Sequence, residues 1–341
     1  MLDHKIPPAR AHLQRLETKF EDLTEKHAVV GSTATATYLF ALRAWINENK
    51  IPVGAEVIVS GLCPSTIILN LMDLELVPVF ADIDADTLQV TAKTVAAAKT
   101  DKTVAVFIEH FGGYPAPIDE IHGWCKARQF TLMDDASQCL PTEYKHWECG
   151  DWPSDMTFFN FSGNRLFTGC DGGVVCLESD ILARACATQR RQDVWADEDG
   201  EVRGYKAFLT EPKALQIMNA LGGIVAAYNK RSMIWGMYQR AFDLDGVYLP
   251  WDDSADVKQS CSHYALRLES ARDYLVQGLA KRGIAVPRPI KPVYKMDIWK
   301  LPVPQLPVLE EFIVNEVSLP ISHDLNLIQV QQIIEAVKRI A

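Results

Sequence analysis

The feature that most constrains the fold is the alternation of short β-rich apolar runs with stretches of helical spacing in the first half of the chain. The runs expected to form buried strands are Glu56–Gly61, Pro78–Ile83, Val104–His110 and Thr131–Ala136, and the helical patterns between them are Pro64–Leu74, Ala92–Lys99 and Pro117–Arg128. Strands that alternate with helices at this rhythm form βαβ units, in which the strands are parallel. The sequence therefore predicts an α/β fold with a mostly parallel central sheet.

The rest of the chain predicts further strands in this sheet and then a second, smaller unit. In chain order we expect strands at Thr157–Phe161 and Gly173–Leu177, a helix at Asp180–Arg191, a polar loop at Gln192–Arg203, a long helix from Glu211 to Asp243 that Gly222 and Gly223 could break, a strand at His263–Leu268, a helix at Ala271–Arg282, an irregular proline-rich segment at Pro287–Pro307 and a last helix at Gln329–Ile340. This order predicts a large domain over residues 1–245 and a small C-terminal α/β domain over residues 246–341.

Charge and composition exclude several classes of function. Lys and Arg number 34 against 44 Asp and Glu, which gives a formal net charge of −10, and an acidic chain lacks the basic surface of a general nucleic-acid binder. No run approaches the roughly 18 apolar residues of a membrane span, and the N-terminus has no apolar segment typical of a secretory signal. The eight cysteines and eight histidines form no CxxC or HExxH motif, so neither a disulfide framework nor structural zinc is expected. We expect a soluble, reduced, cytoplasmic protein.

Candidate site residues follow the predicted strands, because ligands of parallel α/β sheets lie beyond the carboxyl ends of the strands. Asp134 and Asp135 close one strand, and neighbouring residues on a strand face opposite ways, so only one of them can face a site. That carboxylate could stabilise a cofactor nitrogen, bind a metal or cap the next helix. The later run FFNFSGNRLFTGCDGG, at Phe158–Gly173, is either a loop at the mouth of the sheet or a plain connection with Arg165 on the surface.

Taken together, the motifs resemble those of the DegT–DnrJ–StrS family of nucleotide-sugar aminotransferases almost from end to end. The matching segments are the glycine turn before ALRAW (Gly31–Trp45), GAEVIVSG (Gly54–Gly61), VPVFADID (Val77–Asp84), HFGGYPAPIDEI (His110–Ile121), DDASQ (Asp134–Gln138), DGG (Asp171–Gly173), GYKAFLTE (Gly204–Glu211) and SLPIS (Ser318–Ser322). The resemblance implies the fold-type-I architecture of enzymes that use pyridoxal phosphate (PLP), with a mostly parallel sheet in the large domain. It also implies a homodimer.

The resemblance also assigns cofactor-binding roles to residues of this chain. Asp135 matches the aspartate that pairs with the pyridine nitrogen and lets the ring act as an electron sink. Gln138 matches the glutamine that packs near the cofactor ring. Hydroxyl and backbone donors for the phosphate would come from Ser32, Thr33 or Thr35 at a helix start, where the register is open by three residues.

Four positions depart from the family pattern around this one cofactor. Counting back from the DGG motif, the PLP-anchoring lysine is replaced by Arg165, or by Asn164 if the register slips by one. Arginine stays protonated and delocalised, so it cannot replace the amine as nucleophile or proton carrier. The phosphate-binding serine becomes Asn160, the aromatic residue that stacks on the ring becomes Pro64, and the Asn or Arg that reaches the phosphate from the partner subunit becomes Phe208.

These departures leave three functions open. The chain could be a protein of nucleotide-sugar or polysaccharide biosynthesis whose transaminase activity is lost or replaced. It could instead use PLP or pyridoxamine phosphate (PMP) noncovalently on a nucleotide-linked keto-sugar, as an aminotransferase or as a 3-dehydratase like the family members with histidine at the lysine position. It could also be a noncatalytic partner of an active paralogue. Arg165 then either binds an anionic ligand such as a nucleotide sugar or pairs with Asp135, and the protein would hold PLP or PMP noncovalently or hold neither.

Overall fold

A computed structural model describes most of the chain. The described residues are 10–162, 171–191, 194–197, 200–251, 253–269, 272–286, 291–296 and 304–340, with the backbone alone at 194–197 and 200–203. No helix among them combines the length and the apolar character that a bilayer crossing needs. Arg165 and Asn164, the two candidates for the position of the family lysine, lie outside the described residues.

A seven-stranded sheet forms the centre of the molecule, in the order β1-β9-β8-β5-β4-β2-β3. Its strands are β1 (His27–Gly31), β2 (Glu56–Ser60), β3 (Val77–Ala81), β4 (Thr103–Glu109), β5 (Thr131–Asp135), β8 (Met156–Asn160) and β9 (Gly173–Leu177). Only β9 runs against its neighbours β1 and β8, and every other neighbouring pair is parallel. The predicted mostly parallel α/β sheet is confirmed.

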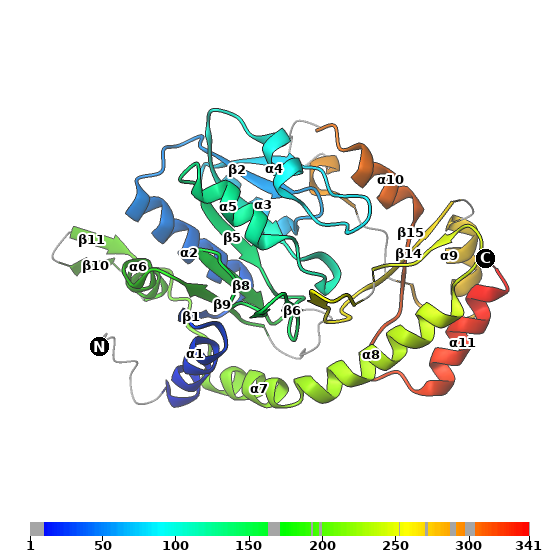
Figure 1. Ribbon diagram of the computed structural model, residues 1–341. Helices are drawn as coiled ribbons and strands as arrows, with labels where there is room; N and C mark the ends of the chain where they lie inside the picture. The colour runs from blue at the N-terminus through cyan, green and yellow to red at the C-terminus, as the bar shows by residue number, and fades with distance from the viewer. Residues whose placement is uncertain are drawn as a thin grey trace.

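Helices cover both faces of this sheet (Figure 1). One face is covered by α2 (Ala34–Asn49), α3 (Ser65–Asp73) and α6 (Asp180–Arg190), and the other by α1 (Ala11–Thr24), α4 (Ala92–Ala98), α5 (Ile118–Lys126) and α7 (Glu211–Gly222). Successive strand residues point to opposite faces of the sheet. Val57 and Val59 pack under α2 and α3, and Ile58 packs on the opposite side. Two-sided burial explains why these strands are continuous apolar runs in the sequence.

A smaller sheet, β12 (Val247–Tyr248), β14 (Tyr264–Leu268) and β15 (Glu316–Leu319), packs with α8 (Ile224–Ala241), α9 (Arg272–Ala280) and α11 (Leu327–Lys338) around a separate apolar core. In Figure 1, α7 and α8 follow one another along one edge of the molecule and connect the large sheet to this core. The helical run is interrupted at Gly223, between α7 and α8, as the two glycines predict. The division of the chain after residue 245 stays a prediction.

One prediction for local structure is wrong, and the N-terminal elements α1 and β1 were not predicted. The expected polar loop at Gln192–Arg203 contains a hairpin of β10 (Val194–Asp197) and β11 (Gly200–Arg203), which is consistent with the strand-forming residues Val194, Trp195 and Val202 among the charges. Helix α10 (Pro307–Asn315), which was not predicted either, begins at the last proline of the proline-rich segment. Proline is tolerated in the first turn, where its missing N–H has no acceptor to lose.

The remaining elements are short. A three-stranded ribbon consists of β13 (Val257–Lys258), β6 (Glu143–Tyr144) and β7 (Trp147–Glu148). The 3-10 turn η2 (Phe111–Gly113) follows β4, and the 3-10 turn η3 (Val293–Lys295) precedes α10. Turn η2 begins directly after His110 at the carboxyl end of β4. It therefore lies at the same edge of the sheet as the ends of β2 and β5.

Candidate functional site

The start of α2 is one side of the candidate site. Thr33 is its N-cap, and the Thr33 hydroxyl accepts a hydrogen bond from the Ala36 amide at 3.1 Å. The Ser32 amide is already used, because it donates to the Ala207 carbonyl at 2.8 Å. The remaining first-turn amides, with the exposed Thr35 beside them, have no acceptor within the helix and point toward the carboxyl edge of the sheet. This arrangement suits a phosphate.

The two aspartates at the end of β5 face opposite sides of the sheet. Asp134 is fully buried, and its carboxylate accepts hydrogen bonds from the Trp152 indole and the Thr157 hydroxyl, both at 2.9 Å. It also lies 3.3 Å from Nε2 of His110, whose Nδ1 accepts from the Ala116 amide at 3.0 Å. His110 is thus a core histidine with both ring nitrogens used, and Asp134 belongs to the structural interior.

A buried lysine completes the cluster around Asp134. The Nζ atom of Lys26 donates to the Trp152 carbonyl at 2.9 Å and to the hydroxyls of Ser154 and Thr157 at 3.1 Å each. Burial raises the pKa of Asp134, but the hydrogen bond and charge of His110, the charge of Lys26 and a hydrogen bond from Ser154 outweigh burial and lower it. Since an ammonium has three N–H donors, the three acceptors commit Lys26 to this role.

Asp135 faces the α2 side of the sheet and lies at the carboxyl end of β5. Its Oδ2 accepts a hydrogen bond from the Tyr38 hydroxyl at 2.9 Å, and its Oδ1 accepts one from the Ser137 amide at 2.8 Å. Asp135 and Tyr38 are each only 2% exposed. Each carboxylate oxygen has two lone pairs, so Asp135 has acceptor capacity beyond these two bonds.

Gln138 and the end of β2 lie near Asp135. The Gln138 amide donates to Oε1 of Glu109 at 2.8 Å, which joins the turn after β5 to the end of β4. Burial, and then the charges of Glu109 and Asp135, raise the pKa of the Cys63 thiol well above its usual value. Cys63 directly precedes Pro64, the N-cap residue of α3. A proline ring at that point has no π-face to stack on a cofactor.

Asn160 connects Asp135 to the loop that follows β8. Its amide donates to the Ser137 hydroxyl at 2.7 Å, and its side-chain Oδ1 accepts from the amide and hydroxyl of Ser162 at 2.8 and 2.7 Å. The side-chain Oδ1 of Asn160 therefore points toward the start of the loop that follows β8. Arg165 lies outside the described residues, so its position relative to Asp135 is not described.

Phe208 packs inward on the opposite face of the sheet. Guanidinium carbons lie over its ring at 3.6 Å for Arg10 and 4.8 Å for Arg190, and Arg190 also pairs with Glu17 of α1. An aromatic ring that contacts two cations contributes packing here. This position offers no polar donor to a phosphate.

Sequence reasoning missed Tyr38 and Lys26. Tyr38 lies in the otherwise apolar stretch YLFAL of α2, and a buried tyrosine needs a hydrogen-bond partner, which was a usable signal. Lys26 directly precedes the apolar β1, but nothing in the sequence indicates which carboxylate it approaches. Their partners lie 97 and 131 residues away, for Tyr38 to Asp135 and for Lys26 to Thr157.

The residues present fit the ring nitrogen and phosphate of a B6 vitamer, and the part of the sequence where the resemblance places the lysine contains none. Asp135 supplies a buried carboxylate and the α2 start supplies amides, as described above. No lysine occurs in the sequence between Lys145 and Lys206, a stretch that spans β8, the following loop, β9 and α6. Lys26 faces away from Asp135 and has its three donors committed. Among the described residues there is also no cluster of ligands suited to a metal ion.

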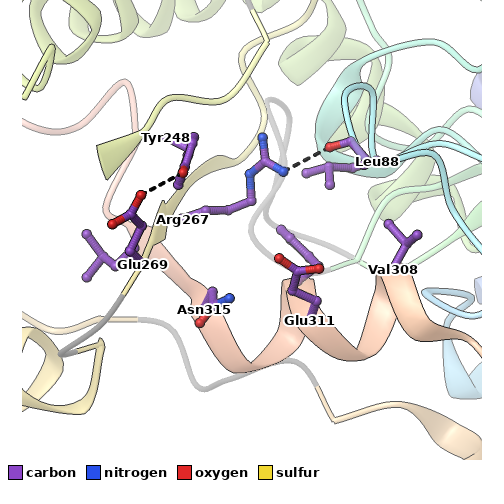
Figure 2. Close-up of a pocket in the computed structure, with 10 residues that line it drawn as sticks. Leu88, Tyr248, Arg267, Glu269, Val308, Glu311 and Asn315 are labelled. Carbon is purple, nitrogen blue, oxygen red and sulfur yellow. Dashed lines mark hydrogen bonds between the residues drawn. The ribbon is translucent and has the colours of Figure 1, made fainter. Parts of the chain in front are cut away.

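A pocket lies where the loop after β3 meets the small sheet and α10 (Figure 2). This cavity of about 410 Å³ is bounded by the loop after β3, by β14 and by α10. Arg267 crosses it to donate to the Ala85 carbonyl at 2.9 Å, and the Tyr248 hydroxyl donates to Glu269 at 2.8 Å. One guanidinium beside the carboxylates of Glu269 and Glu311 gives the cavity mixed charge, so charge selects no single class of ligand for it.

Comparison with known proteins agrees with this architecture. The sequence model of the DegT/DnrJ/EryC1/StrS aminotransferase family matches residues 9–338. The aminotransferase TlmJ from Streptoalloteichus hindustanus is similar in structure, with a TM-score of 0.88 at 22% identity over 96% of this chain and 90% of that chain. DesV from S. venezuelae gives a TM-score of 0.87 at 25% identity, over 96% and 88% of the two chains. Helicobacter pylori PseC, an aminotransferase involved in the biosynthesis of pseudoaminic acid, gives 0.87 at 22%, over 96% and 90%. The predicted fold-type-I architecture is confirmed.

Proposed function

Because the chain belongs to the DegT/DnrJ/EryC1/StrS aminotransferase family, we propose that it is a sugar-aminotransferase-like protein that holds PLP or PMP noncovalently and does not carry out covalent PLP transamination. The observation that carries the proposal is a contrast within one site. Asp135 is buried and held by two donors, whereas the chain has no lysine from residue 146 to residue 205. The site keeps the means to bind the vitamer and lacks the means to bond it.

Each remaining residue of the site has a definite task in this proposal. A bound vitamer supplies an electron sink when its ring nitrogen stays protonated. The Asp135 carboxylate would accept a hydrogen bond from that ring N–H, and the amides at the α2 start, beside Thr33 and Thr35, would bind the phosphate. Gln138, anchored on Glu109, closes the side of the ring next to β4. None of these groups can replace the amine of a lysine as a proton carrier.

The substrate side of the proposal is an anionic, nucleotide-linked sugar bound by a cytoplasmic homodimer. Arg165 is the residue that we expect to capture its anionic part, because a planar guanidinium can bind phosphate or carboxylate with two parallel hydrogen bonds. The name of PseC as an enzyme of pseudoaminic acid biosynthesis supports a sugar ligand in this family.

A specific observation favours a second candidate, a protein that binds a sugar nucleotide and no vitamer. Phe208 replaces the phosphate ligand expected from the partner subunit, and it packs inward between Arg10 and Arg190. Loss of that ligand weakens the hold on the vitamer phosphate. A third role, as a noncatalytic partner of an active paralogue, requires neither ligand.

Absorbance titration of the purified protein with PLP and with PMP, followed by calorimetric titration with UDP-, GDP- and dTDP-sugars, tests the proposal. Saturable binding of a vitamer, retained after gel filtration and lost in Asp135→Asn, is the expected result. Binding of a sugar nucleotide alone would replace the proposal with the second candidate. If neither ligand binds, the partner role is tested by co-purification with an intact aminotransferase.

A further inference from the structure

The Asp135 carboxylate is held in place by a residue that has no assigned role, Tyr38. Its hydroxyl donates to Oδ2 of Asp135 at 2.9 Å, and both side chains are 2% exposed. The tyrosine ring packs on Phe158 at 4.8 Å and edge-on to Phe107 at 6.2 Å between centroids. These contacts fix the phenol, because rings in a packed core have few rotamers open to them.

The side from which Tyr38 approaches Asp135 matters. Helix α2 begins at the carboxyl edge of the sheet, and Tyr38 lies five residues beyond its N-cap Thr33, which is more than a full turn deeper. Phe158, under the ring of Tyr38, is the direct register partner of Asp135 on β8. The hydroxyl therefore reaches the carboxylate from inside the molecule. The lone pairs directed to the carboxyl edge are left for a ligand.

The second oxygen is fixed in the same way by the chain itself. The Ser137 amide donates to Oδ1 of Asp135 at 2.8 Å, and the Ser137 hydroxyl accepts from the Asn160 amide at 2.7 Å. Two donors on two different oxygens determine the plane of the carboxylate. Both donors suit the ionised form, which only accepts hydrogen bonds.

We propose that Tyr38 is a positioning residue that orients the Asp135 carboxylate toward the pyridine nitrogen of PLP or PMP. The inference rests on the proposed function, because it needs a vitamer that binds at Asp135. Tyr38 touches no ligand in this account. It acts by holding the carboxylate plane, and so it sets how firmly the ring nitrogen keeps its proton.

Tyr38→Phe removes only the hydroxyl, and the chain offers a matched control. The Tyr144 hydroxyl also donates to a carboxylate, Oδ1 of Asp119 at 2.8 Å, on the other face of the sheet. Tyr144→Phe therefore deletes a tyrosine–carboxylate bond that does not involve Asp135. Asp135→Asn is a second variant that keeps the tyrosine and removes the carboxylate. Circular dichroism verifies that each variant is folded.

The readouts are the dissociation constant for PMP and PLP and the pH dependence of the absorbance of the bound vitamer. We expect Tyr38→Phe to weaken binding about tenfold, the scale for a hydrogen bond to a charged group. We also expect the spectral transition of the bound ring to move to lower pH, as in Asp135→Asn. Tyr144→Phe should change neither readout.

The outcomes separate this inference from the function on which it rests. If the wild type binds a vitamer and Tyr38→Phe matches it in affinity and spectrum, the positioning role is overturned and the proposed function stands. If Tyr38→Phe and Tyr144→Phe lose stability alike with no spectral change, the tyrosine is only structural. If the wild type binds neither PLP nor PMP, the proposed function fails and the inference fails with it.

Discussion

Asp134 and Asp135 are chemically identical neighbours on β5, yet the protein surrounds them differently. Asp134 has hydrogen bonds from Trp152 and Thr157, with His110 and the buried Lys26 cluster beside it. Asp135 has two donors, the Tyr38 hydroxyl and the Ser137 amide, and lies at the edge where ligands bind. The carboxylate inside the interior has its charge balanced within the chain. The carboxylate at the edge keeps acceptor capacity that its two donors among the described residues do not use.

The largest test of this contrast compares Asp134→Ala with Asp135→Ala in urea unfolding. Removing Asp134 leaves the Lys26 ammonium buried without its counter-charge and leaves several donors unpaired, which should cost about 3–5 kcal/mol. Removing Asp135 should cost about 1–3 kcal/mol, because two neutral donors lose an acceptor. Equal losses in the two variants would show that both carboxylates are structural.

Ligand binding should reverse the order of the two residues. Asp135→Ala is expected to weaken PMP binding by about 2 kcal/mol, or roughly thirtyfold, because a charge-assisted hydrogen bond to the ring nitrogen is lost. Asp134→Asn, measured at a temperature where it is folded, should bind PMP like the wild type. Absorbance titration gives both constants. Loss of affinity in Asp134→Asn would contradict the assignment of Asp134 to the interior.

A smaller effect is expected at the start of α2. Thr33→Ala removes the hydroxyl that accepts from the Ala36 amide, and the loss of an N-cap costs about 1 kcal/mol of stability. The exposed Thr35 makes a neighbouring control, since Thr35→Ala removes no cap and should leave stability within about 0.5 kcal/mol of the wild type. Thermal unfolding of the two variants measures the difference. Equal stabilities would contradict the capping role of Thr33.

The smallest effect is expected in how the free energy of unfolding declines at acid pH. The pKa of Asp134 is lowered in the folded protein, so its contribution is present above its unfolded pKa of about 3.9 and is lost as the pH falls through the folded value. Asp134→Asn should therefore flatten the decline of stability below about pH 4. Urea midpoints from pH 3 to 6 provide the test, and a steeper decline in Asp134→Asn would contradict the sign.

The sequence predicts the sheet well because burial on both faces leaves a strong local signal. Continuous apolar runs such as Val104–His110 and Thr131–Ala136 became β4 and β5. The opposite orientation of Asp134 and Asp135 followed from the pleat alone. The β10–β11 hairpin was not predicted, because charged residues interrupt the apolar pattern that a strand would show. The formation of such short strand pairs depends strongly on contacts with the rest of the protein.

The site is less predictable, because its contacts join residues that are far apart in the chain. The pairing of Tyr38 with Asp135 depends on how α2 packs on β8, which no local pattern encodes. Family resemblance assigned Asp135, Gln138 and Asn160 to the cofactor, and those assignments stay predictions. The same holds for Arg165, which lies outside the described residues. The role assigned to Arg165 therefore rests on the sequence alone.

The most direct test of the central claim is borohydride reduction of the PLP-loaded protein followed by intact mass measurement. Our account predicts a saturable absorbance change on binding, no stoichiometric mass increase after reduction, and full release of PLP on denaturation. Asp135→Asn, treated at a PLP concentration that saturates the wild type but lies below the weakened dissociation constant of the variant, is the control for nonspecific labelling of surface lysines. A stoichiometric pyridoxyl adduct in the wild type and not in the control would contradict the account, and peptide mapping would then identify the lysine that bonds the cofactor.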